Sequence, residues 1–294
     1  MSSQILTSTP TRAADRLSAP LFALPAGACD SHVHVFGPER LYPHVDAPHY
    51  TLPDGEIPKL ISMTRAMTLD RFVIVQPSFY GTDNRCMLDA LDAAGSRARG
   101  VAMVPDNTAD AELQAMHARG VRALRLDLFL RSKLKTAEMI TYIERSVRQT
   151  RRLGWHVQFY TPGWVVRDLL PFLATLEADF VIDHMGYMLE SDGLTRADFD
   201  RLLKMVGDGH GCIKLSAPYR LAKDGNFQRL LPLARALIEA APDSMIWGSD
   251  WPHIPDGNRD TGAYLNLLAE WAPDEKVRKR ILVDNPTRLF GFDP

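Results

Sequence analysis

Eight short apolar runs, rich in β-branched residues, recur along this chain and alternate with longer amphipathic segments. Each run is short enough to be a strand and is bounded by turn-forming residues. The runs are Ala28–Val35, Arg71–Pro77, Gly100–Val104, Val121–Phe129, His156–Tyr160, Phe180–Met185, Cys212–Ser216 and Met245–Asp250. Eight strand–helix units in 294 residues are the count of a (β/α)8 TIM barrel, and we expect this α/β fold.

The segments between these runs predict helices and a simple domain organisation. Helices are expected at 83–98, 109–119, 136–153, 164–177, 197–207, 226–241, 261–272 and 274–283, with a terminal turn from Asn285. An open doubly wound sheet is the competing fold, but its usual Gly-rich phosphate turn is missing after the first strand, where only Gly37 occurs. We expect an N-terminal arm at 1–22, one barrel domain at 23–294, and a Pro-rich binding loop at 36–58.

Composition excludes several classes of partner. Lys and Arg number 34 and Asp and Glu number 36, which gives a formal charge of −2 and no field to hold a nucleic acid or an anionic membrane. Cys29, Cys86 and Cys212 are too few and too scattered for a disulfide framework. We expect a cytoplasmic protein with a small-molecule substrate and with no nucleic-acid or membrane partner; the sequence leaves its oligomeric state open.

Polar and ionisable residues end most of the predicted strands. They are His32, His34, Ser78, Arg125, Asp127, Tyr160, Asp183, His184, Ser216 and Asp250. TIM-barrel enzymes place their chemistry at these carboxyl ends. Bringing such groups together costs hydration free energy unless they bind a ligand or one another. The sequence therefore predicts an active site at this end of the barrel.

The His32–Val33–His34 pattern places two imidazoles on the same face of the first strand. A lone strand histidine is more often a satisfied core residue. The histidine pair combined with His184 and with Asp250 after the last strand instead has the layout of an amidohydrolase-type centre. We therefore interpret these four residues as catalytic.

Longer motifs extend this comparison along the chain. They are GACDSHVHVFGP, VIVQPSFYGTDN, VRALRLDLFLR, WHVQFY, VIDHMG, IKLSAPYR, IWGSDWPH and NPTRLF. On these motifs the chain resembles the amidohydrolase superfamily from about Pro25 to Phe292 and, within it, the lactonases of the 2-pyrone-4,6-dicarboxylate type. The resemblance implies a metal-free hydrolase that opens a carboxylate-bearing lactone in aromatic-acid degradation.

Without a metal, protein groups must activate the water and polarise the lactone carbonyl. Asp250 is expected to act as the general base. His32, His34 and His184 are expected to donate hydrogen bonds to the developing oxyanion.

Three arginines suggest a substrate with more than one carboxylate. Arg125 faces the barrel interior because it alternates with leucines, and Arg131 and Arg220 follow strand ends. An internal pair between Arg125 and Asp127 is the structural alternative. By resemblance, the substrate carboxylates are held by Tyr50, Ser78, Arg125, Arg131, Tyr160 and Arg220.

A metal centre is the main alternative. Mononuclear zinc members of the superfamily need a histidine ending the fifth strand, where this chain has Tyr160, and His156 lies at that strand's other end. We therefore expect no cofactor; one zinc at His32, His34 and Asp250, in a zinc-dependent hydrolase or decarboxylase, stays open. A sugar-lactone hydrolase or isomerase and a non-catalytic carboxylate-binding protein are further alternatives. Asp127, Lys214 and His253 have no assigned role.

Overall fold

The computed structural model describes residues 17–45, 51–188, 194–255, 257 and 259–293, so Tyr50 lies outside the described residues. Eight strands pair in parallel in the order of the sequence. Their bounds are β1 Cys29–Val33, β2 Arg71–Val75, β3 Ala98–Ala102, β4 Val121–Asp127, β5 His156–Tyr160, β6 Phe180–Ile182, β7 Cys212–Ser216 and β8 Met245–Gly248. The predicted (β/α)8 barrel is confirmed.

The first strand and the segment after the last strand close the barrel. The Asp250 amide donates to the His32 carbonyl at 2.9 Å, and the His34 amide donates to the Trp251 carbonyl at 2.8 Å. A side chain could not be placed at Gly248, since a Cβ there would lie 2.6 Å from the His32 Cβ. Glycine at this position therefore allows the close approach that brings β1 and Asp250 together.

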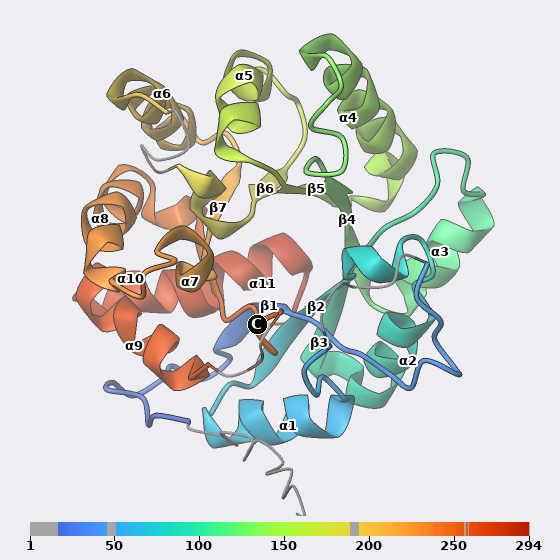
Figure 1. Cartoon of the computed structure of the whole chain (residues 1–294), viewed down its shortest axis with the longest axis horizontal. Helices are drawn as coiled ribbons and strands as arrows, with labels where there is room; N and C mark the ends of the chain where they lie inside the picture. The colour runs from blue at the N-terminus through green and yellow to red at the C-terminus, as the bar shows by residue number, and fades with distance from the viewer. Residues whose placement is uncertain (1–16, 46–50, 189–193, 256, 258, 294) are drawn as a thin grey trace, which may run out of the picture.

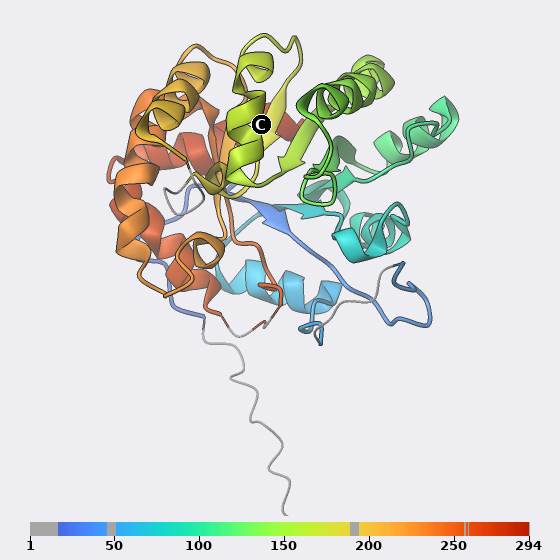
Figure 2. The same ribbon diagram turned by 45° about the horizontal axis from the view of Figure 1, so that its top comes forward.

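The helices surround the strands (Figures 1 and 2). Their bounds are α1 Ile57–Ala66, α2 Arg85–Ala94, α3 Asp110–Ala118, α4 Thr136–Thr150, α5 Gly163–Leu173, α6 Arg196–Gly207, α7 Pro218–Leu221, α8 Leu231–Ala240, α9 Thr261–Trp271, α10 Glu275–Lys279 and α11 Asn285–Phe290. Among the described residues, no helix is long and apolar enough to cross a membrane.

Several elements differ from the sequence prediction. Helix α1 was not predicted, although its buried Leu60 and Met63 lie one turn apart, and neither was the short helix α7. The predicted terminal turn is the helix α11. Strand β3 begins at Ala98 rather than Gly100, because helix α2 already ends at Ala94.

The barrel interior is divided into an apolar half and a polar half. At the amino ends of the strands, Cys29, Val73, Cys212 and other small apolar side chains pack with Phe290 and Phe292. Helix α11, which crosses the middle of Figure 1, supplies Phe290, whose ring centroid lies 5.0 Å from that of His156. His156 is a polar exception at this end, whereas His34, His184 and Asp250 lie at the carboxyl ends of the strands, where the sequence predicts the site.

Candidate active site

Asp250 lies directly after β8 with a left-handed backbone (φ 65°) and a fully buried side chain. Its Oδ2 accepts hydrogen bonds from the Tyr219 hydroxyl at 2.5 Å and the Arg220 Nε at 2.7 Å. Its Oδ1 has no hydrogen-bond partner among the described residues. Burial alone would raise the pKa of Asp250, but the Arg220 guanidinium holds it well below its usual range. The site therefore contains an ionised carboxylate with one oxygen available.

Two imidazoles lie close to that oxygen, and a third packs against one of them. His34 Nε2 lies 3.3 Å and His32 Nε2 lies 3.6 Å from Asp250 Oδ1. The ring centroids of His32 and His184 are 4.9 Å apart. Burial lowers the pKa of His184 to about 3, so its ring is neutral, and its Nδ1 lies 2.8 Å from the Ser216 hydroxyl. The structure thus brings together the four residues that the sequence analysis interprets as catalytic.

The hydrogen bonds of His34 fix the position of its proton. Its Nδ1 lies 2.8 Å from the Val75 carbonyl oxygen, which can only accept, so Nδ1 carries the hydrogen. Burial lowers the pKa of His34 and favours the neutral ring. The Nε2 that faces Asp250 is then an acceptor. This differs from the expectation that His34 donates to an oxyanion.

His32 has the opposite arrangement because a lysine contacts it. The Nζ of Lys214, on β7, lies 3.1 Å from His32 Nδ1 and 3.0 Å from Asp183 Oδ1. All three side chains are fully buried, and Gln158 Nε2 donates to the other oxygen of Asp183 at 3.0 Å. An ammonium group offers only donors, so His32 Nδ1 accepts and the ring hydrogen lies on Nε2.

These proton positions decide whether the residues fit a metal ion. His32 Nε2, His34 Nε2 and Asp250 Oδ1 lie within 4.8 Å of one another and are of the types that zinc takes. With hydrogen on Nε2, however, His32 has no lone pair for an ion on that side. Only two metal-ligand atoms of the group then remain, His34 Nε2 and Asp250 Oδ1, one fewer than a catalytic zinc site uses. With Lys214 donating to His32, the group does not fit a zinc centre.

Arg125 projects from β4 into the barrel and is 5% exposed. Its Nη1 donates to the Gln76 carbonyl at 2.8 Å, and its guanidinium lies 4.6 Å from the centre of the Tyr160 ring. The structure describes both Arg125 and Asp127 and has no ion pair between them, so the internal pair considered from the sequence does not form. The Arg125 guanidinium and the Tyr160 ring are in contact, and both residues were predicted to bind a substrate carboxylate.

Asp127 organises the turn after β4. Its Oδ2 accepts from the Ser78 hydroxyl at 2.5 Å and its Oδ1 from the Leu130 amide at 3.1 Å. Arg131 donates to the Asp127 carbonyl at 3.2 Å, and its guanidinium lies 4.2 Å from the centre of the Tyr142 ring. Since the Ser78 hydroxyl donates its hydrogen bond to Asp127, it can only accept from a substrate, whereas it was expected to donate to a substrate carboxylate.

Sequence reasoning missed Tyr219 as a site residue. Its ring packs parallel to that of Tyr264 at 5.8 Å, and its hydroxyl bonds to Asp250. The signal available was its place beside Arg220 in the APYR motif after β7. His253, which had no assigned role, holds Asp250 through its backbone, with its amide donating to the Asp250 carbonyl at 2.7 Å.

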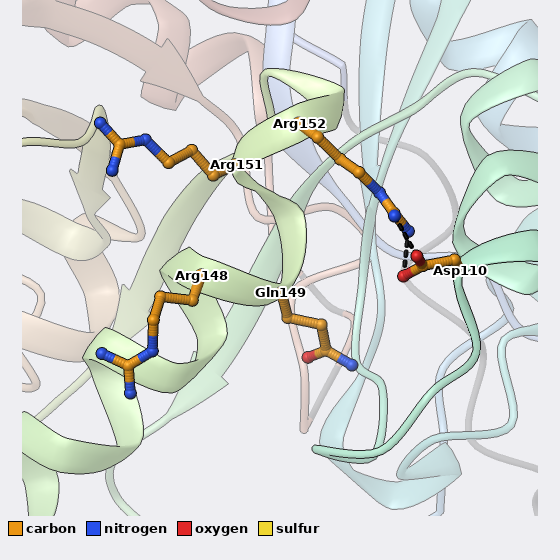
Figure 3. A pocket seen from close by; sticks show the side chains of 5 residues that line it. All are labelled: Asp110, Arg148, Gln149, Arg151 and Arg152. Carbon is orange, nitrogen blue, oxygen red and sulfur yellow. Dashed lines mark hydrogen bonds and ion pairs between the residues drawn. The ribbon is translucent and has the colours of Figure 1, made fainter.

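A separate cavity of about 510 Å³ lies outside the barrel and contains none of these residues (Figure 3). Its lining includes Arg148, Arg151 and Arg152 from the end of α4 and the turn after it. Arg152 forms an ion pair with Asp110, which neutralises part of its charge. The cavity is therefore distinct from the candidate active site.

Comparison with known proteins adds independent evidence. The amidohydrolase family model matches residues 29–292. The chain is 35% identical over 285 residues to a 2-pyrone-4,6-dicarboxylate hydrolase of Comamonas testosteroni, and 35% identical over 280 residues to a 4-sulfomuconolactone hydrolase of Rhizobium radiobacter; 93% of each chain is covered in both comparisons.

A solved structure gives the same result. It is of a probable 2-pyrone-4,6-dicarboxylic acid hydrolase from Acinetobacter baumannii with citric acid bound, and it matches with a TM-score of 0.77 at 29% identity, covering 90% of this chain and 100% of that chain. The chain belongs to the amidohydrolase family and groups with its lactone hydrolases.

Proposed function

We propose that this enzyme hydrolyses a carboxylate-bearing lactone of the 2-pyrone-4,6-dicarboxylate type, in the cytoplasm and as a step in aromatic-acid degradation. The observation that carries the proposal is the free Oδ1 of an ionised Asp250, with an acceptor on one side (His34 Nε2) and a donor on the other (His32 Nε2). The activity of the Comamonas and Rhizobium relatives supports a lactone substrate.

In the proposed reaction, a water molecule donates one hydrogen to Asp250 Oδ1, the carboxylate oxygen that has no hydrogen-bond partner among the described residues. As its oxygen adds to the lactone carbonyl carbon, one proton moves to Asp250. The carbonyl oxygen becomes an oxyanion that His32 Nε2–H and His184 stabilise. The tetrahedral intermediate then collapses, the ring C–O bond breaks, and Asp250 returns the proton to the leaving oxygen.

The proposed carboxylate site is formed by Arg125, Arg131, Arg220 and Tyr160. Guanidinium groups bind carboxylates through paired hydrogen bonds, and the citric acid in the Acinetobacter structure is consistent with a family pocket that accepts polycarboxylates. A substrate carboxylate that bonds to Arg220 weakens that residue's hold on Asp250. The pKa of Asp250 then rises toward its usual range, which makes it a stronger base once substrate is bound.

We also propose that no metal takes part. Lys214 contacts His32 Nδ1 at 3.1 Å, which leaves the ring hydrogen on Nε2. This supports the proposal because a zinc ion at the site would need a lone pair on Nε2. Zinc, when bound, would lower the pKa of its water and polarise the carbonyl; a zinc-dependent hydrolase is the rival that a chelator experiment addresses. Activity that survives chelation with less than stoichiometric metal supports the proposal, and activity restored only by zinc contradicts it.

A panel of lactones tests the substrate class. We expect kcat/KM to be highest for 2-pyrone-4,6-dicarboxylate, lower for 4-sulfomuconolactone and lowest for an uncharged sugar lactone, since the last offers the three arginines no carboxylate to bind. Hydrolysis of sugar lactones alone would contradict the proposal. Ligands that raise the melting temperature without any turnover would indicate a carboxylate-binding protein instead.

A further inference from the structure

The buried Lys214 takes no direct part in the proposed reaction, yet it contacts a residue that does. Its side chain is fully buried and lies 3.1 Å from His32 Nδ1 and 3.0 Å from Asp183 Oδ1. Burial of an ammonium group is costly unless it is paired. Asp183 supplies the countercharge, and the contact with His32 then gives the lysine a second effect.

Two groups compete for the Nδ1 of His32. Lys214 offers a donor at 3.1 Å, whereas Asp183 offers an acceptor at 3.4 Å. Lys214 is nearer, and its charge also engages the oxygen of Asp183 that would attract a hydrogen on Nδ1. The lysine therefore favours the ring form with hydrogen on Nε2.

We propose that Lys214 is a positioning residue that holds His32 in the Nε2–H form and thereby keeps this barrel from binding a divalent metal at His32, His34 and Asp250. The same Nε2–H supplies the oxyanion donor, and this part of the inference rests on the proposed function. The exclusion of the metal rests only on the contacts of His32.

Removal of the lysine should reverse both properties. In Lys214→Met, Asp183 is the remaining neighbour of His32 Nδ1 at 3.4 Å, so the ring hydrogen moves to Nδ1. The freed Nε2 then joins His34 Nε2, whose own hydrogen is already held by the Val75 carbonyl. The variant acquires the three-ligand group of a catalytic zinc site, with each histidine oriented through its other nitrogen.

The ring form of His32 can be read directly by two-bond ¹H–¹⁵N correlation NMR of the uniformly labelled full chain without substrate. The His32 signals are assigned by their loss in His32→Asn. We expect Nε2–H in the wild-type protein and Nδ1–H in Lys214→Met. Hydrogen on Nδ1 in the wild type would overturn the proposal, and this measurement does not depend on whether any lysine variant folds.

Zinc binding to the same proteins gives the second readout. By titration calorimetry with ZnCl₂, Lys214→Met should bind zinc more tightly than the wild type by about 10–100-fold, the range by which such supporting contacts alter metal affinity. The gain should disappear in Lys214→Met combined with His34→Asn, which assigns it to this site. Equal zinc affinity in the wild type and a folded Lys214→Met would overturn the proposal.

These results are separable from the proposed function. Nε2–H in a protein that hydrolyses no lactone would leave the role of Lys214 in place and remove the proposed activity. Lactone hydrolysis by a wild-type protein with Nδ1–H would retain the activity and refute the role of Lys214.

Discussion

Replacement of Arg220 by glutamine should move the acid limb of the pH–rate profile, because Arg220 contacts the proposed base itself. Its Nε donates to Asp250 Oδ2 at 2.7 Å, and its side chain is 21% exposed. A hydrogen bond between charged groups contributes about 1.5–3 kcal/mol. At ~1.4 kcal/mol per pKa unit, loss of this bond should raise the pKa of Asp250 by about 1–2 units.

The direction follows from the role of Asp250 as a base, which must be ionised to accept a proton. In the wild-type protein Arg220 outweighs burial and holds the pKa of Asp250 well below its usual range, so activity should persist into acid. In Arg220→Gln the fall in kcat/KM should begin about 1–2 pH units higher. The assay is steady-state hydrolysis of 2-pyrone-4,6-dicarboxylate from strongly acidic to neutral pH, so that the acid limbs of both proteins fall within the range.

Arg131→Gln is the matched control. It also removes a guanidinium from the carboxyl ends of the strands, but Arg131 bonds to the Asp127 backbone and lies against Tyr142 rather than on Asp250. It should raise KM and leave the acid limb where it is. If Arg220→Gln lowers the rate without moving that limb, the proposed control of Asp250 by Arg220 is refuted.

Three further variants test other contacts. Tyr219→Phe removes a 2.5 Å bond to Asp250 but keeps the ring packing, so kcat/KM should fall about tenfold with little change in melting temperature; an unchanged rate would contradict this. Asp30, on β1, is fully buried, and its Oδ1 accepts from the His32 and Ser249 amides. Burial raises the pKa of Asp30 to about 6, so this group's contribution to stability is lost as pH rises from about 4 to about 6. In Asp30→Asn the unfolding free energy, measured with urea at both pH values, should fall less between them, by up to about 3 kcal/mol. The same fall in the variant and in the wild type would count against this. Phe290→Ala should cost about 3–5 kcal/mol of unfolding free energy because the ring is fully buried. A loss below ~1 kcal/mol would show that the packing of this ring inside the barrel contributes little to stability.

Much of the fold was predictable because each strand has a short apolar pattern of its own. The bounds of β5 and β7 match the prediction to the residue. Helix α1 was missed although its buried Leu60 and Met63 repeat at helical spacing, because it begins inside the segment expected to be a Pro-rich loop. Helix α11 was missed because its role is not local: its Phe290 enters the barrel from far along the chain.

The convergence of His32, His34, His184 and Asp250 was predictable, but that of Tyr219 and Lys214 with them was not. The position of a residue at a strand end, and the two-residue spacing of His32 and His34, are enough to predict the convergence of those four residues without any interatomic distance. What each group does there depends on partners distant in sequence. The donor to Nδ1 of His32 comes from Lys214, 182 residues away, and the acceptor for Ser78 is Asp127, 49 residues away. Such pairings set proton positions, and no local pattern encodes them.

The central claim is that Asp250 activates water without a metal. Single-turnover hydrolysis of 2-pyrone-4,6-dicarboxylate by chelator-treated wild type and by Asp250→Asn, measured side by side, tests it most directly. We predict that chelated wild type retains its full rate and that Asp250→Asn loses about 10²–10⁴-fold. A chelated wild type that is inactive until zinc is added, or an Asp250→Asn variant that keeps the wild-type rate, would contradict the account.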